Sequence, residues 1–322
     1  MKKLFIKIAA LLLPVAIYFG LFVVFEPYNY FGLKKNNTQN KDDDSIIGRL
    51  IIFENDLPEN LILGDSRMAH FDLEYIEELT GEKYGTLAFG GAAMNETIDL
   101  FWYAAETNPS LKRVVIGVSF YNLNENYFRN RMDQINRIMN NPLAYMLNFN
   151  YNVEMLNNVR YYITGVETGA SMEEGIWPAE DYFYPDGSVR PYRLNLEEYA
   201  GESILSVCTP YNLDTEDLNR LIEVAQYCEQ NGIELIIVMP PAEQSIIDLV
   251  VLPLGIDEDM ASYIPLLQEH ARVLNYEYPS IEWNQDLYYD GFHLDPVRGL
   301  PLFTELLFAQ DIPNEEGAPN GA

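Results

Sequence analysis

The sequence is poor in the residue types that build disulfide scaffolds and metal sites. Its 322 residues include two cysteines and three histidines. Two cysteines are too few for a disulfide scaffold or a cysteine-based zinc site. The three histidines, His70, His270 and His293, share no metal-ligand spacing. A metalloenzyme is therefore not indicated.

Basic residues are also scarce. Lysine and arginine number 20 against 49 acidic residues, which gives a formal net charge of -29. Such a charge repels phosphate backbones, and the sequence has no basic patch, so we expect no nucleic-acid partner. With 48% hydrophobic residues, the chain is neither wholly disordered nor a multi-pass membrane protein. Its length allows one large domain or two small ones.

The N-terminal segment differs from the rest. Three lysines lie within the first seven residues, and an apolar run follows from Ile8 to Phe25. As a helix this run rises roughly 27 Å, enough to cross a hydrocarbon core, and the preceding lysines favour a cytoplasmic N-terminus. The alternatives are a cleaved signal peptide, although no small-residue cleavage site follows, and a buried core helix.

We therefore predict a single-pass protein of the cell membrane with its main domain outside. Residues 1–30 form the anchor, residues 31–57 a tether, and residues 313–322 a disordered tail. In that compartment Cys208 and Cys228 could form a disulfide, a point that the sequence leaves open.

Short apolar strands alternate with amphipathic helices between residues 58 and 312. This order predicts an α/β fold, with a parallel sheet of about five strands covered by helices on both faces. The alternation stops over residues 121–214, which we interpret as an insertion above the carboxyl edge of the sheet. We expect strands at 60–63, 84–89, 111–120, 233–239 and 276–281, and helices at about 73–80, 95–108, 218–231, 261–274 and 297–308.

Three polar segments fall at strand ends, where open α/β sheets form their sites. Ser66 follows the first strand on a short turn, so its hydroxyl suits a nucleophile and its amide an oxyanion donor. Gly90 and Gly91 follow the second strand, where a backbone amide can approach an oxyanion. Asp290 lies three residues before His293, a spacing that lets the carboxylate orient the imidazole as a base.

Together these segments resemble blocks of the SGNH (GDSL-type) hydrolase superfamily. The matching stretches are Ile62–Arg67 (ILGDSR), Leu87–Ala92 (LAFGGA) and Asp290–His293 (DGFH). The resemblance covers about residues 58 to 310 without the insertion. It implies a flavodoxin-like three-layer fold, and ester hydrolysis or acyl transfer without a metal or organic cofactor.

The resemblance also implies a role for each site residue. Ser66 corresponds to the nucleophile, with Asp290 and His293 as its orienting acid and base. Gly91 corresponds to a backbone oxyanion donor. Asn122 is the nearest candidate for the oxyanion side chain, although the sequence after the third strand departs from the family spacing.

Arg67, next to the nucleophile, has two interpretations. Its guanidinium can bind an anionic group of the substrate or acceptor, or it can anchor the turn through a salt bridge.

The anchor and the three blocks together are similar to the membrane-anchored branch of the family. Some of its members modify cell-wall polymers or exopolysaccharides beside a membrane-bound O-acyltransferase. We thus predict a serine esterase or O-acyltransferase that acts on acyl esters of a cell-surface glycan or polymer. The alternatives are a catalytically silent assembly or binding protein and a plain esterase of small esters.

Overall fold

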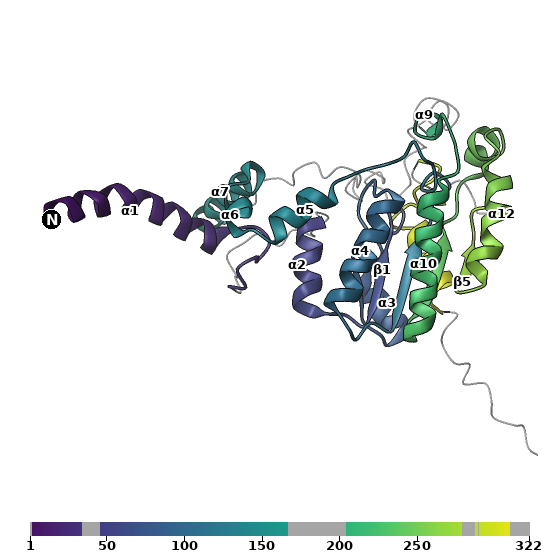
Figure 1. Ribbon diagram of the computed structural model, residues 1–322, viewed down its shortest axis with the longest axis horizontal. Coiled ribbons are helices and arrows are strands. Elements are labelled where there is room, and N and C mark those ends of the chain that lie inside the picture. Colours follow the sequence, from purple (N-terminus) through teal and green to yellow (C-terminus); the bar gives the residue numbers. More distant parts are fainter. Residues whose placement is uncertain (1, 34–45, 167–203, 279–286, 289, 310–322) are drawn as a thin grey trace, which may run out of the picture. The chain divides into compact units, whose positions relative to one another are not determined.

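The computed structural model describes residues 2–33, 46–166, 204–278, 287–288 and 290–309 (Figure 1). It divides into two compact units. The smaller contains residues 1–55 and 131–174, and the larger contains residues 56–130 and 175–322. The predicted tail at 313–322, residues 34–45 of the predicted tether and residues 167–203 of the predicted insertion lie outside the described residues.

The larger unit contains a five-stranded parallel sheet in the order β2-β1-β3-β4-β5. This sheet confirms the predicted fold class. The central strands β1, β3 and β4 are apolar and almost wholly buried, as expected of a parallel sheet covered on both faces. The strands are β1 Asn60–Leu63, β2 Tyr84–Thr86, β3 Arg113–Gly117, β4 Glu234–Met239 and β5 Arg272–Asn275.

The last strand begins earlier than the sequence pattern predicts. Val273 and Leu274, expected in a helix, pair in parallel with Ile237 and Val238 of β4. Their pairing completes the sheet edge and ends the preceding helix at Gln268. The predicted helix over 261–274 and strand over 276–281 were therefore wrong at this boundary.

Helices cover both faces of the sheet. In Figure 1, α4 and α10 lie over one face, and α12 packs beside α10 and against β5. On the other face α3 packs against α13. The bounds are α3 Leu73–Thr80, α4 Met94–Thr107, α10 Thr215–Asn231, α12 Ile256–Gln268 and α13 Gly299–Phe308. Short elements complete the unit: α9 Leu205–Cys208, α11 Gln244–Ile246 and a π-helical turn at Ile247–Val251.

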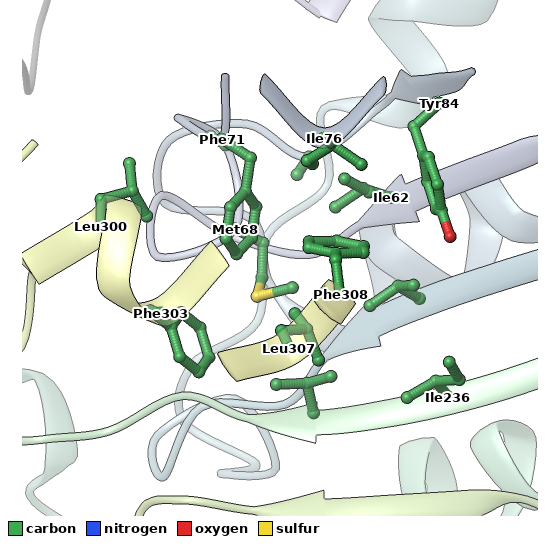
Figure 2. Close-up of a cluster of buried hydrophobic side chains, with 14 residues drawn as sticks. Ile62, Met68, Phe71, Ile76, Tyr84, Ile236, Leu300, Phe303, Leu307 and Phe308 are labelled. Carbon is green, nitrogen blue, oxygen red and sulfur yellow. The ribbon is translucent and has the colours of Figure 1, made fainter. Parts of the chain in front are cut away.

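One core cluster joins α13 and α3 to the sheet (Figure 2). Phe71 packs against Phe303 and Phe308, with ring centroids 5.8 and 5.5 Å apart. Met68, just after the predicted nucleophile, is fully buried in the same cluster. Burying one such side chain stabilises the fold by about 1.5–3 kcal/mol. The cluster therefore fixes the turn after β1 to the helical layer.

The smaller unit combines the N-terminal segment with part of the predicted insertion. It contains α1 Lys2–Phe25, α2 Ile46–Asp56, α5 Met132–Met139, α6 Pro142–Met146 and α7 Phe149–Thr164. Among the described residues, α1 is the helix long and apolar enough to cross a membrane.

Two of our expectations are corrected by this unit. Residues 46–56, predicted as tether, form α2, because apolar side chains at helical spacing, including Leu50 and Phe53, are buried. The predicted insertion at 121–214 does not belong to one unit, because residues 131–164 belong to the unit that contains α1.

Candidate active site

The candidate nucleophile lies on a tight turn after β1. Gly64 ends the strand with a φ of +139°, and a Cβ there would lie 2.9 Å from a Met68 side-chain carbon and 3.3 Å from the Gly117 Cα. Glycine is therefore required both by the backbone conformation and by the close approach of β3. The Met68 amide donates to the Asp65 carbonyl over 3.0 Å, which closes the turn. Ser66 is the partly exposed residue in this otherwise buried turn.

Ser66, His293 and Asp290 form one chain of hydrogen bonds. Ser66 Oγ lies 2.6 Å from His293 Nε2, and His293 Nδ1 lies 2.6 Å from Asp290 Oδ2. The serine and the Asp–His pair are more than 200 positions apart in the sequence, and the fold brings them together at the carboxyl end of the sheet. The arrangement is that of a nucleophile, a base and an orienting carboxylate.

Local hydrogen bonds prepare the histidine for this role. Asp290 Oδ1 accepts the amides of Phe292 and His293, over 3.2 and 2.7 Å, and its other oxygen faces the imidazole. The Asp290 side chain is 6% exposed and that of His293 25%. A carboxylate on Nδ1 favours the tautomer with its proton there, which leaves Nε2 free to accept the serine proton. The site thus combines a sheltered carboxylate with an accessible base.

The second glycine segment lies beside the nucleophile turn. The amide of Phe89 donates to the carbonyl of Gly64 over 3.1 Å, and the amide of Ala92 donates to the carbonyl of Phe89 over 3.2 Å. Within this turn Gly91 has a φ of +61°, a conformation that glycine adopts at low cost. The two turns that carry the predicted oxyanion amides, those of Ser66 and Gly91, are therefore joined by a backbone hydrogen bond.

Asn122, which follows β3, holds the turn that contains Gly91 in place. Its side-chain amide donates to the Ala92 carbonyl over 3.1 Å and accepts the Ser119 amide over 2.8 Å. The residue is 3% exposed. These contacts connect it to the residue after Gly91, and its direct role as an oxyanion donor stays a prediction.

The Arg67 side chain is buried and paired within the protein, so its guanidinium is not presented to a substrate or an acceptor alcohol. Its side chain is 1% exposed and donates to Glu277 Oε1 and to the Pro240 carbonyl, each over 2.6 Å. This contact corrects the prediction that Arg67 binds substrate and supports the alternative, an anchor for the turn. Burial raises the pKa of Glu277 to about 7, although the guanidinium opposes that rise.

Two residues near the site were missed by sequence reasoning. Tyr121 donates its hydroxyl to Asp65 Oδ2 over 2.6 Å, while Asp65 Oδ1 accepts the Arg67 amide over 2.9 Å. The hydroxyl of Tyr127 lies 3.7 Å from the place that a Cβ on Gly91 would take. Both follow β3 at the carboxyl edge of the sheet, and this position is the one signal that could have drawn attention to them.

The other histidines and the cysteines lie outside the hydrogen-bonded chain. His270 pairs with Glu229 Oε2 over 2.7 Å, but its Nε2 faces Gln226 rather than a hydroxyl. Cys208 and Cys228 are both buried and unpaired, and burial raises the pKa of each thiol to about 12. Within the part of the chain that the structure describes, no three metal-ligating side chains gather into a possible metal site.

The buried ion pair gives a prediction on stability. We expect Arg67→Met to lower the free energy of unfolding by about 3–5 kcal/mol, because the Glu277 carboxyl would lose its buried partner. A carboxyl whose pKa is higher in the folded than in the unfolded state favours folding while it is protonated. This contribution is complete below the unfolded pKa of 4.5 and is lost as the pH rises through the folded pKa of about 7. Losing Arg67 raises that pKa further, so above about pH 7 wild type stops losing stability while the variant continues to lose it. The deficit against wild type should therefore grow as the pH rises above about 7.

Urea unfolding of both proteins at one pH below and one pH well above about 7 measures the effect. The double variant Arg67→Met with Glu277→Leu is the matched control, and it should recover most of the lost stability because no buried charge remains. A deficit that is the same at both pH values would contradict the assignment.

Comparison with known proteins finds likenesses among solved structures. No family model matches the sequence, and no curated protein matches it. A solved structure from Bacteroides fragilis, described as a proposed acylhydrolase, is 12% identical with a TM-score of 0.39. That match covers 84% of this chain and 99% of the other. A GDSL-like lipase from Bacteroides thetaiotaomicron is 14% identical with a TM-score of 0.37, over 83% and 97% of the two chains.

TM-scores below 0.5 carry no inference about activity, which has to be argued from the geometry of Ser66, His293 and Asp290. The cell-wall branch of the family stays a prediction.

Proposed function

We propose that this protein is a serine ester hydrolase or O-acyltransferase of the SGNH type, acting on acyl esters of a cell-surface glycan or polymer. The observation that carries the proposal is the hydrogen-bonded chain from Ser66 Oγ through His293 to Asp290, with 2.6 Å at each contact. The adjacent turn of Gly91 supplies a backbone amide beside the nucleophile.

The proposed reaction has two halves. Ser66 Oγ attacks the acyl carbon and forms a new C–O bond, while His293 Nε2 takes the serine proton. The amides of Ser66 and Gly91 stabilise the oxyanion. As the bond to the leaving alcohol breaks, His293 returns the proton to that alcohol. Water or a sugar hydroxyl then attacks the acyl-enzyme and loses its proton to His293 Nε2. The bond from the acyl carbon to Ser66 Oγ breaks, His293 returns the proton to Oγ, and an acid or a new ester leaves.

The apolar helix α1 supports a place at the membrane. Its last turns belong to the core of the smaller unit, where Phe22 is fully buried and the Phe25 carbonyl accepts the side-chain amide of Asn158 over 2.9 Å. Cleavage after Phe25 would remove these contacts, so we favour a retained anchor over a cleaved signal peptide. An anchored esterase meets envelope polymers at high local concentration, which favours them over diffusing small esters.

Product analysis tests the choice between transfer and hydrolysis. We expect the full chain in detergent, given p-nitrophenyl acetate and neutral oligosaccharides, to form acetylated sugar detectable by mass spectrometry, or to release acetate from an acetylated polysaccharide. The strongly acidic chain disfavours polyanionic acceptors, so neutral glycans are the first choice.

The Ser66→Ala variant is the control for both products. Rapid hydrolysis of p-nitrophenyl acetate, with no acetyl-sugar and no release from polymer, would favour the plain esterase. No reaction at all, together with no labelling by a fluorophosphonate, would favour the silent binding protein.

A further inference from the structure

The pair of helices α6 and α7 packs against the C-terminal part of α1. Tyr18 of α1 donates a hydrogen bond to Asn152, and the rings of Phe22 and Tyr145 pack edge to face with centroids 5.7 Å apart. The Tyr145 hydroxyl donates to the buried carboxylate of Glu26 over 2.7 Å. Together with Asn158 at the Phe25 carbonyl, these contacts fix α6 and α7 beside the last part of α1.

The position of these contacts along α1 determines the depth at which α6 and α7 lie in the bilayer. Tyr18 and Phe25 are seven residues apart, which corresponds to about 10 Å of helix. If α1 spans the bilayer, its last 10 Å lie in the outer leaflet and the adjoining interface. The helices that contact this stretch must then lie at the same level.

Much of the exposed surface of α6 and α7 is apolar. On α7, four exposed side chains fall on one stripe at spacings of four, three and seven residues, and two more are exposed on or next to α6. We call these six residues the α6–α7 face: Leu143, Leu147, Phe149, Val153, Leu156 and Ile163, which are between 39% and 79% exposed.

The polarity of α7 is partly inverted relative to a helix of a soluble protein, although Met155 is buried on its inner side. Asn152 and Asn158 turn inward, where they make hydrogen bonds to α1, while the apolar stripe turns outward. In water the opposite arrangement is favoured, because apolar area is driven out of the solvent. Exposed Arg160 lies within the stripe, and its long side chain can reach lipid phosphates while its stem stays in apolar surroundings. Lipid is the surrounding that fits this pattern.

We propose that α6 and α7 form a second membrane-contacting element, which inserts the α6–α7 face into the outer-leaflet interface beside α1. The occupant of this face is thus the acyl-chain and headgroup boundary of the bilayer. The inference rests on the proposed transmembrane position of α1 and is independent of the serine chemistry.

Depth-dependent quenching tests this placement. Single cysteines at Leu156 and Ile163 are labelled with the fluorophore NBD in the full chain, which is reconstituted into phosphatidylcholine and phosphatidylglycerol liposomes. Cys208 and Cys228 are buried with raised thiol pKa values, so they react slowly, and unlabelled wild type measures that background. We expect a blue shift, and loss of most fluorescence when the lipids carry nitroxide on their acyl chains, with little quenching by aqueous iodide.

Two matched positions make the outcomes distinct. Gln134→Cys lies on an exposed position of α5 and should be quenched by iodide, and Leu13→Cys reports on α1. Quenching at Leu13 but iodide access at Leu156 and Ile163 would overturn this inference alone, whereas iodide access at Leu13 would overturn the anchor as well. Protection of Leu156 and Ile163 from both quenchers would show that protein covers the face and would equally overturn the proposal.

Discussion

Replacing Ser66 with alanine should abolish covalent labelling by a fluorophosphonate and lower the kcat for p-nitrophenyl acetate by up to about 10⁶-fold. The reason is that Ser66 Oγ lies 2.6 Å from His293 Nε2, so the variant keeps the base and loses the group that it activates. The Ser66 side chain is partly exposed and makes no core contact that alanine would leave empty, so the thermal midpoint should change little.

Ser262→Ala is the matched control. Ser262 is also an exposed serine of the larger unit, but its hydroxyl donates to the Asp259 carbonyl within α12. This variant should be labelled as wild type is, and peptide mapping should locate the label on Ser66. Undiminished labelling of the Ser66→Ala protein would refute the nucleophile.

Local sequence signals account for much of the fold. Asp72 caps α3 by accepting two backbone amides, and Gly81 ends the helix with a φ of +71°. Both ends follow from single residues with strong local preferences. The boundary between α12 and β5 could not be predicted from local signals. Val273 and Leu274 suit a helix or a strand, and their pairing with β4 makes them part of the strand.

The candidate site, too, has a part that local sequence predicts and a part that it does not. Ser66, Asp290 and His293 stand in short segments with recognisable spacing, and strand order alone brings those segments to one edge of the sheet. The support around them depends on contacts over long sequence separations. Arg67 pairs with Glu277 across 210 positions, and no local pattern marks either residue as the other's partner.

The smaller unit could not be predicted, because its parts are distant in sequence. The sequence marks α1 by its length and hydrophobicity, but the asparagines and tyrosines of α6 and α7 show no preference for it. Their pairing depends on shape and on single hydrogen bonds, such as that from Tyr145 to Glu26. The insertion therefore looked like one segment and contributes to two units.

Replacing Asp290 with asparagine should lower kcat by about 10⁴-fold while the protein stays folded. Asparagine keeps an oxygen for the amides of Phe292 and His293, so the turn should survive. It loses the charge that holds the Nδ1 proton and stabilises the imidazolium formed as Ser66 attacks.

Glu229→Gln is the matched control for this last prediction. It removes the carboxylate from His270, the other histidine–carboxylate pair of the larger unit, which has no hydroxyl at its Nε2. Its kcat for p-nitrophenyl acetate should equal that of wild type, because His270 is not part of the chain from Ser66 to Asp290. The protein should stay folded, since losing an exposed pair costs at most about 1 kcal/mol of stability. If Asp290→Asn retained wild-type kcat, or if both variants lost activity equally, the carboxylate of Asp290 would not be the group that orients the base.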